Sequence, residues 1–222
     1  MRILITGASR GIGRAWVKHY VKAGHEVWAG CRNPEVWQAP VAAHLHPLKL
    51  DVSDLEMIQQ AASGIQSGLD LIINNAGVAG GREQPFGRLD YHAWQEAFVV
   101  NTLGPVRIAE AFLDHLSKSQ QGKFVTVSSQ MASMSKPGRG AYGYRSTKAA
   151  VNKVMQLLTE DMKNFSIACL TLHPGWVRTD MGGSGADISV EQSVTGMCQV
   201  IANLDMGNTG SFRTWQGDVH PW

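Results

Sequence analysis

Tyr144 and Lys148 stand four residues apart in a stretch with helical patterning. Residues four apart share one face of an α-helix, so the phenol and the ammonium would be neighbours. Free tyrosine, with a pKa of about 10, exchanges protons poorly at neutral pH. A nearby positive charge favours the phenolate and lowers that pKa. The pair therefore predicts an acid–base centre, although a buried tyrosine and a snorkelling lysine on an ordinary amphipathic helix have the same pattern.

A glycine-rich segment near the start of the chain predicts a phosphate-binding turn. Residues 3–13 read ILITGASRGIG, with Gly7, Gly11 and Gly13 between an apolar run and a helical pattern. The missing side chains permit a tight turn and let backbone N–H groups approach a pyrophosphate, to which a helix N-terminus adds a favourable dipole. The spacing differs from the common G-x-G-x-x-G dinucleotide motif. For this segment alone, a tight turn without a ligand is the alternative.

Short apolar runs alternate with longer helical patterns along the whole chain. Runs rich in Val, Ile and Leu without strict alternation are typical of parallel strands buried on both faces. We expect strands at 2–6, 25–30, 45–50, 69–74, 122–128, 166–173 and 210–214, and helices at 11–23, 53–66, 90–118, 142–164 and 189–203. The pattern predicts one α/β domain over 1–222, a doubly wound parallel sheet of the Rossmann type with about seven strands flanked by helices.

The ends of the helices carry their own signals. Gly24 is expected to terminate the first helix, and Ser53 to begin the second. Ser189 and Gln192 have the spacing of a capping box at the last helix.

Six unusual segments each follow a different expected strand. In open parallel sheets, ligands bind beyond the carboxyl ends of the strands. The segments are 7–13, 31–32, 51–52, 74–77, 128–129 and 174–175. They are therefore expected to meet at one edge of the sheet.

The motifs also occur in a familiar order. The chain contains TGASRGIG at 6–13, NNAG at 74–77, Asn101, Ser128-Ser129, the Tyr144/Lys148 pair and PGWVRT at 174–179. In combination they resemble the short-chain dehydrogenase/reductase family over essentially the whole chain. The run HPGWVRTDMGG is more narrowly similar to the small C-factor-type, carbonyl-reductase-like members.

The resemblance implies an NAD(P)(H)-dependent enzyme that interconverts a carbonyl and a primary or secondary alcohol, with Tyr144 as proton donor or acceptor. The charge of an oxidised nicotinamide would then add to that of Lys148 in favouring the phenolate. A cofactor-binding regulatory or signalling protein with weak or no catalysis is the alternative. An epimerase or dehydratase on the same fold is another.

The resemblance also assigns roles to residues. It makes Asn101, Ser129, Tyr144 and Lys148 the catalytic set. Ser129 would hydrogen-bond the substrate carbonyl, with Ser128 as its possible substitute, and Asn101 would hold a water or a backbone carbonyl near Lys148. A buried structural amide is the alternative for Asn101.

The cofactor contacts follow in the same way. Lys148 would also bind the nicotinamide ribose, Thr179 the carboxamide, and Asp51 and Val52 the adenine end, although Asp51 could instead cap the next helix. The middle of the cofactor would lie along 74–77. The full predicted set is Gly7, Ser9, Arg10, Gly11, Ile12, Gly13, Arg32, Asp51, Val52, Asn74, Asn75, Ala76, Gly77, Tyr144, Lys148, Pro174, Gly175, Val177 and Thr179.

The end of the second strand favours NADP(H) over NAD(H). An acidic residue about 20 residues beyond the glycine turn usually binds the ribose 2′-OH of NAD. Here the stretch after Gly30 has Arg32 and no acid before Glu35. A guanidinium pairs with a 2′-phosphate, and Arg10 could add a second cation. A solvated loop charge is the alternative for Arg32.

Tyr142 competes with Tyr144. Ser129 lies thirteen residues before Tyr142, a common spacing in the family, and fifteen before Tyr144. Only Tyr144 has a lysine at i+4, because the residue four after Tyr142 is Ser146. A loop tolerates two extra residues easily, so we assign the role to Tyr144.

Composition and charge limit the classes of partner that we expect. A net charge of +2 is too small to indicate nucleic acid or an anionic membrane, and no apolar run reaches the length of about 20 residues that a membrane helix needs. Without a signal peptide, and with three scattered cysteines, we expect a cytoplasmic protein. A homodimer, a homotetramer and a monomer all stay open.

Apart from the cofactor, the sequence indicates an apolar substrate and no metal. Met131, Met134, Trp176 and Met181 form either an apolar substrate wall or ordinary core, and suggest a small apolar carbonyl or alcohol as substrate. His44 and His46 alternate on one strand without other ligand-type residues at suitable spacing, so no metal is expected.

Overall fold

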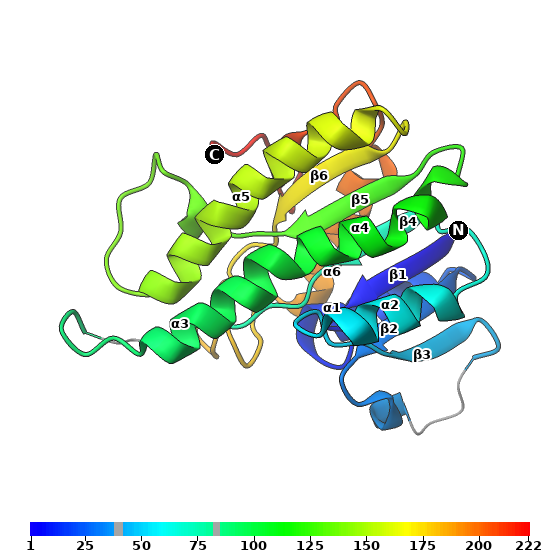
Figure 1. Ribbon diagram of the computed structural model, residues 1–222. Coiled ribbons are helices and arrows are strands. Elements are labelled where there is room, and N and C mark those ends of the chain that lie inside the picture. Colours follow the sequence, from blue (N-terminus) through cyan, green and yellow to red (C-terminus); the bar gives the residue numbers. More distant parts are fainter. Residues whose placement is uncertain (38–41, 82–84) are drawn as a thin grey trace.

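A computed structural model describes residues 1–37, 42–81 and 85–222 (Figure 1). Within them lies one seven-stranded, all-parallel sheet in the order β3-β2-β1-β4-β5-β6-β7. The strands are β1 (Arg2–Thr6), β2 (Glu26–Cys31), β3 (Leu45–Lys49), β4 (Leu71–Asn74), β5 (Lys123–Val127), β6 (Ala168–His173) and β7 (Ser211–Thr214). The doubly wound, Rossmann-type sheet expected from the sequence is confirmed.

Helices cover both faces of the sheet, and α2, α4 and α5 lie in front of it in Figure 1. The helices are α1 (Gly11–Lys22), α2 (Leu55–Gly64), α3 (Tyr91–Phe98), α4 (Gly104–Ser117), α5 (Tyr142–Lys163) and α6 (Val190–Ala202). One core cluster includes Trp16 of α1 and Val194 of α6, and the other includes Ile108 of α4 and Val151 of α5. Among the described residues, no helix has the length and hydrophobicity required to cross a membrane.

Strand β1 explains why the strand patterns lack alternation. Ile3 and Ile5 belong to one core cluster while Leu4 belongs to the other, and all three are fully buried. Since both faces of the strand are covered, every position must be apolar. Each such side chain contributes about 1.5–3 kcal/mol by leaving water. The winding of the chain reverses between β1 and β4, so a crevice is expected beyond their carboxyl ends.

The helix expected at 90–118 is divided in three. The π-helix η2 (Val99–Leu103) separates α3 from α4 and carries the buried Asn101 at its centre. A π-turn is a local widening of a helix that is frequent at functional sites. Local patterning could not reveal it, because the flanking residues keep their helical spacing.

Helix ends were only partly predicted. Gly24 follows α1 with φ of 79°, and Ser189 and Gln192 form the expected capping box at α6. The expected start at Ser53 is wrong, because Asp54 is the N-cap of α2 and accepts a bond from Met57 N. Two short 3-10 turns, η1 (Pro34–Trp37) and η3 (Gln130–Ala132), were not expected.

Candidate active site

The first turns of α5 bring Tyr144 and Lys148 together. The Lys148 Nζ lies 6.0 Å from the centroid of the Tyr144 ring. Lys148 is buried and donates a hydrogen bond of 2.8 Å to the carbonyl of Val127, at the end of β5. Burial lowers the pKa of Lys148 to about 8. Among the described residues, the ammonium is thus held at the strand end by one neutral carbonyl, and an ammonium has three donor hydrogens.

Ser129 is the serine that meets the tyrosine. Its side chain hydrogen-bonds that of Tyr144 and accepts a bond of 3.1 Å from Met131 N at the start of η3. Ser128 Oγ instead donates to Asn152 Oδ1 at 2.6 Å and so fastens the end of β5 to α5. The geometry therefore groups Ser129, not Ser128, with Tyr144.

Two opposing effects act on the tyrosine. Burial raises the pKa of Tyr144, and the hydrogen bond from Ser129 opposes that rise without cancelling it. The protein's own groups therefore act against the decrease that the Tyr144–Lys148 spacing predicts. The physical reason is desolvation, which disfavours the phenolate more strongly than the hydrogen bond from Ser129 favours it.

Tyr142 points elsewhere. Its ring is 6.1 Å from that of Trp94 and 6.4 Å from that of Phe86, on the outer side of α5. The geometry therefore groups Tyr144, and not Tyr142, with Ser129 and Lys148.

Asn101 fastens the loop after β4. Its Nδ2 donates to Val78 O at 2.9 Å and to Thr147 Oγ1 at 3.0 Å, and its Oδ1 accepts from Val78 N at 2.8 Å. A Cβ placed on Gly77 would stand 3.3 Å from Asn101 Oδ1 and 3.6 Å from Lys148 Nζ. Asn101 thus fastens the Gly77–Val78 backbone, which lies beside Lys148.

The glycine turn has the shape of a phosphate cradle. Gly7 and Gly11 adopt φ of 63° and 52°, which side chains rarely allow. A Cβ on Gly13 would collide with the carbonyl of Gly7, so α1 can approach the strand end only with glycine there. No side chain caps α1, which leaves its first N–H groups for a ligand. These features fit the pyrophosphate of a dinucleotide.

Hydrogen bonds join the glycine turn to the residues that follow the neighbouring strand β4. Asn75 Nδ2 donates to the carbonyls of Thr6 and Gly7 at 3.0 and 3.1 Å. Thr6 Oγ1 accepts from the backbone N–H groups of Asn75 and Ala76, each at 3.1 Å. Sequence reasoning missed Thr6, although a polar residue at the end of a buried apolar strand was a usable signal.

The two arginines proposed for the adenine side have different surroundings. Arg32 is exposed and makes no ion pair within the described part of the chain, whereas Arg10 pairs with Asp180 at 2.8 Å. Asp51 accepts bonds from the backbone and side chain of Ser53, so the alternative that it caps α2 is wrong. Val52 is buried against Gly104.

The loop after β6 closes the opposite side. Gly175 has φ of 86°, and Pro174 O accepts a 2.6 Å bond from Ser193. Thr179 Oγ1 accepts a bond of 3.0 Å from Gly182 N, and a Cβ on Gly11 would lie 3.5 Å from the Thr179 methyl. The glycine turn and this loop therefore face each other.

The predicted apolar wall is not core. Met134, Trp176 and Met181 are 87%, 49% and 39% exposed, and Met131 is partly buried. Sequence reasoning missed the main-chain oxygen of Trp222, which accepts bonds from Ser133 Oγ and Met134 N at 3.0 and 3.1 Å. Local sequence patterns do not predict such a contact between segments that are far apart in the chain.

The histidines that could suggest a metal have other partners. His46 stacks on Trp28 with ring centroids 5.0 Å apart and contacts Glu26, and His44 Nε2 lies 2.9 Å from Val21 O.

Comparisons with known proteins agree with this geometry. A family model described as short chain dehydrogenase matches residues 1–187. The chain is 38% identical over 155 residues to the C-signal protein of Myxococcus xanthus, covering 69% of this chain and 93% of that protein.

Two solved structures cover all of this chain. The NADPH-bound carbonyl reductase from chicken fatty liver has a TM-score of 0.90 and 32% identity, with 98% of that chain covered. The carbonyl reductase Sniffer of D. melanogaster has a TM-score of 0.94 and 28% identity, with 99% covered. The chain therefore belongs to the short-chain dehydrogenase/reductase family of NAD(P)-dependent oxidoreductases.

Proposed function

We propose that this protein is an NADPH-dependent carbonyl reductase that reduces small apolar aldehydes or ketones to alcohols and can run the reverse reaction. The observation that carries the proposal is the convergence of Ser129 and Lys148 on Tyr144, beside Gly77 and the glycine turn. An acid–base group without a redox partner would not need a dinucleotide cradle next to it.

Each residue of the site has its own role in the proposed reaction. Ser129 donates a hydrogen bond to the substrate carbonyl, and Tyr144 gives its phenolic proton to the oxygen as that oxygen becomes an alcohol. Lys148, held by Val127 O, stabilises the phenolate that remains. Asn101 keeps the Gly77–Val78 backbone in place beside Lys148. A bound nicotinamide coenzyme supplies or accepts the hydride.

The coenzyme would be held by the backbone of 7–13, with 51–52 at the adenine, 75–77 along the middle and 174–179 at the nicotinamide. The preference for NADP(H) rests on Arg32, which is exposed and free of ion pairs among the described residues, and on Arg10. A guanidinium binds a phosphate by paired charge-assisted bonds. The similarity to an NADPH-bound carbonyl reductase supports this preference.

The exposed apolar side chains near the site indicate the substrate class. Met134, Trp176 and Met181 present apolar surface on the loops that follow Ser129 and β6. Apolar surface favours carbonyl compounds with an apolar body and gives little selectivity among them. We also place the enzyme in the cytoplasm, because its three free cysteines are all buried and suit a reducing compartment.

A second function is favoured by one observation. The similarity to the C-signal protein supports a signalling role in which a bound coenzyme stabilises the fold and catalysis is weak. Such a protein would not need the serine, tyrosine and lysine together, so their grouping favours the enzyme.

The test is NADPH oxidation with a panel of aldehydes, ketones and diketones. We expect turnover with several apolar members and its loss in Tyr144→Phe, with Tyr142→Phe as the matched control. Coenzyme binding without turnover on any carbonyl would favour the signalling role. Activity that survives Tyr144→Phe would refute the proposed acid.

A further inference from the structure

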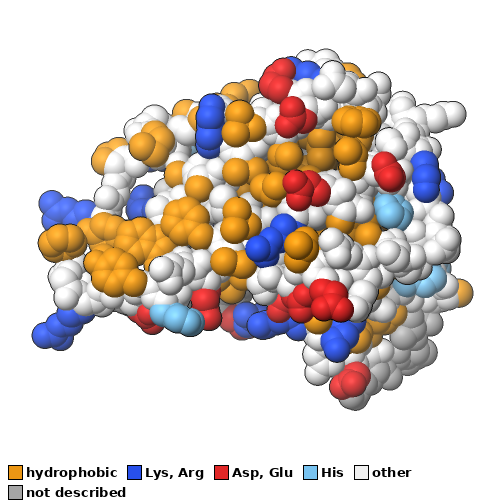
Figure 2. Space-filling model, in the orientation of Figure 1, with side chains coloured by type: hydrophobic (Ala, Val, Ile, Leu, Met, Phe, Trp, Pro, Cys, Tyr) orange, Lys and Arg blue, Asp and Glu red, His pale blue; other side chains and the backbone are white. Residues whose placement is uncertain are grey.

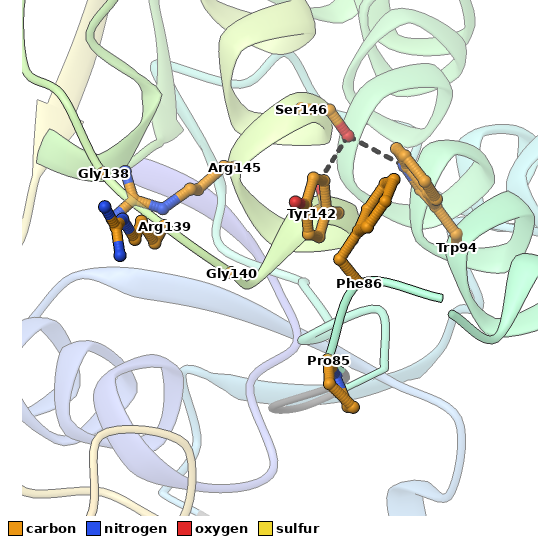
Figure 3. Close-up of a pocket in the computed structure, with 9 residues that line it drawn as sticks. All are labelled: Pro85, Phe86, Trp94, Gly138, Arg139, Gly140, Tyr142, Arg145 and Ser146. Atoms are coloured by element: carbon orange, nitrogen blue, oxygen red, sulfur yellow. Dashed lines mark hydrogen bonds between the residues drawn. The ribbon is translucent and has the colours of Figure 1, made fainter. Parts of the chain in front are cut away.

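A second hollow lies on the side of α5 that faces away from Tyr144. It has a volume of about 630 Å³ and is drawn in Figure 3. Its lining comprises Pro85, Phe86, Trp94, Gly138, Arg139, Gly140, Tyr142, Arg145 and Ser146. With 3.6 residues per turn, Tyr142 and Ser146 lie on the helix face opposite Tyr144, and Arg145 lies on the flank between, about 100° from Tyr144. The backbone of Gly80 packs tightly on Gly143, on the other flank of α5.

One side of the hollow is aromatic. Tyr142 contacts both Phe86 and Trp94, and Phe86 is 85% exposed. Trp94 Nε1 donates to Ser146 Oγ at 2.8 Å, and Ser146 Oγ donates to Tyr142 O at 2.6 Å, so the indole is held in place (Figure 3). In Figure 2, hydrophobic side chains gather at this end of the molecule, over α3 and the start of α5. Exposed aromatic surface of this kind is typical of binding sites.

The other side is cationic. Figure 3 shows Arg139 and Arg145 together across the hollow from the aromatic rings. Within the described residues neither arginine forms an ion pair, and the buried Nε of Arg145 has no hydrogen-bond partner. The guanidinium of Arg145 lies flat against Gly138, where a Cβ would collide with it. The positive charge is therefore positioned, with no acidic partner among the described residues.

The helix itself adds to this charge. Helix α5 has 22 residues, no side chain caps its N-terminus at Ala141, and its first turn holds no acidic residue. An uncapped helix start carries a partial positive charge and free N–H groups, both of which favour an anion. None of the lining residues that the structure describes is acidic.

We propose that this hollow binds a small aromatic carboxylate, with its ring against Phe86, Trp94 and Tyr142 and its carboxylate between Arg139 and Arg145. The volume lies within the range of about 300–1,000 Å³ that is usual for small-molecule sites, and suits a body of two fused rings. Its lining contains none of Ser129, Tyr144 and Lys148, so the proposed site does not use the residues of the proposed carbonyl site.

The test is calorimetric titration of the full-length protein with 2-naphthoate and with its neutral counterpart, 2-naphthylmethanol. We expect naphthoate to bind at least tenfold more tightly. In the double variant Arg139→Gln with Arg145→Gln this preference should disappear. Phe86→Ala should weaken both compounds several-fold. Lys153→Gln, which removes one charge from α5 outside the hollow, should bind as the wild type does.

Three results would overturn the proposal. They are equal affinity for the two compounds, a preference that persists in the double variant, and competition between naphthoate and either NADPH or a carbonyl substrate, which would place the probe in the catalytic cleft. If Arg145→Gln fails to fold, the single variants Arg139→Gln and Phe86→Ala decide the question, because both positions lie on surface loops outside the helices and strands.

Discussion

The two walls of the predicted catalytic cleft are built by different means. The coenzyme wall, made by residues 6–13 and 74–77, is held by hydrogen bonds among Thr6, Gly7, Asn75 and Ala76 and by glycines that leave no room for a Cβ. The substrate wall, made by residues 130–134 and 176–181, exposes large apolar side chains such as Met134 and Trp176. The difference indicates that the first wall tolerates little change, whereas the second can change its side chains without loss of the fold.

The largest effect is expected where the walls meet. Tyr144→Phe removes the proposed proton donor, so kcat for carbonyl reduction should fall about 10²–10⁴-fold, the usual contribution of a positioned acid. NADPH affinity should stay within about twofold, since the phenyl ring keeps its place. Steady-state kinetics and a coenzyme titration measure the two quantities. Tyr142→Phe is the control, and an equal loss in that variant would contradict the assignment.

A single added methyl group should disrupt the coenzyme wall. Gly13→Ala places a Cβ against Gly7 O and Asn75 Nδ2, so we expect a stability loss of about 1–3 kcal/mol and much weaker NADPH binding. Thermal unfolding and a coenzyme titration measure both. Gly64→Ala is the matched control, because nothing lies within 4 Å of a Cβ there. If Gly13→Ala bound coenzyme normally, the contrast between the walls would not hold.

The buried lysine should make turnover pH-dependent. Burial lowers the pKa of Lys148 to about 8, so its charge is lost as the pH rises through that value. Reductive kcat should therefore decline above pH 8, by up to about tenfold per pH unit. Because the unfolded chain keeps this proton up to about pH 10.4, the lysine's contribution to stability should rise between the two values.

The substitution Lys148→Arg tests whether Lys148 causes this pH dependence of kcat. Lys148→Arg keeps its charge throughout this range, so the decline should move to higher pH in whatever activity remains. A kcat profile that is flat to pH 10 in the wild type would show that Lys148 does not carry the effect.

The adenine side should discriminate between coenzymes. Arg32→Ala removes a charge-assisted bond worth about 1.5–3 kcal/mol, so KM for NADPH should rise about tenfold or more while KM for NADH barely changes. Lys153→Gln controls for the loss of one positive charge. Equal changes for both coenzymes would leave Arg32 as a solvated surface charge.

The smallest effect is expected on the substrate wall. Met134→Ala should change the unfolding free energy by less than about 0.5 kcal/mol, because the side chain is 87% exposed. It should alter KM several-fold for some carbonyl substrates and leave KM for NADPH unchanged. Met206→Ala, at an exposed site away from the cleft, is the control. A marked loss of stability would place Met134 with the structural residues.

Local sequence predicted most of the fold and the tight glycine turn at 7–13. Strand β1 was predicted at its observed bounds, because a strand buried on both faces must be apolar throughout. The pairing of Arg10 with Asp180 and of Trp222 with Ser133 was not predictable, since each joins residues far apart in the chain. The direction of the Tyr144 pKa was missed for a related reason. Spacing reports a neighbouring charge, whereas desolvation depends on everything that packs around the phenol.

The π-turn of η2 has a consequence for insertions and deletions. Val99–Leu103 contains one residue more than an α-helical turn would need, and that extra residue brings Asn101 opposite Val78 and Thr147. A deletion of one codon here would let α3 and α4 join as a continuous α-helix. Everything on one side of the junction would then rotate by about 100° relative to the other side. A substitution at Val100 keeps that register, so mutational scans should find this turn far more sensitive to length than to side-chain identity.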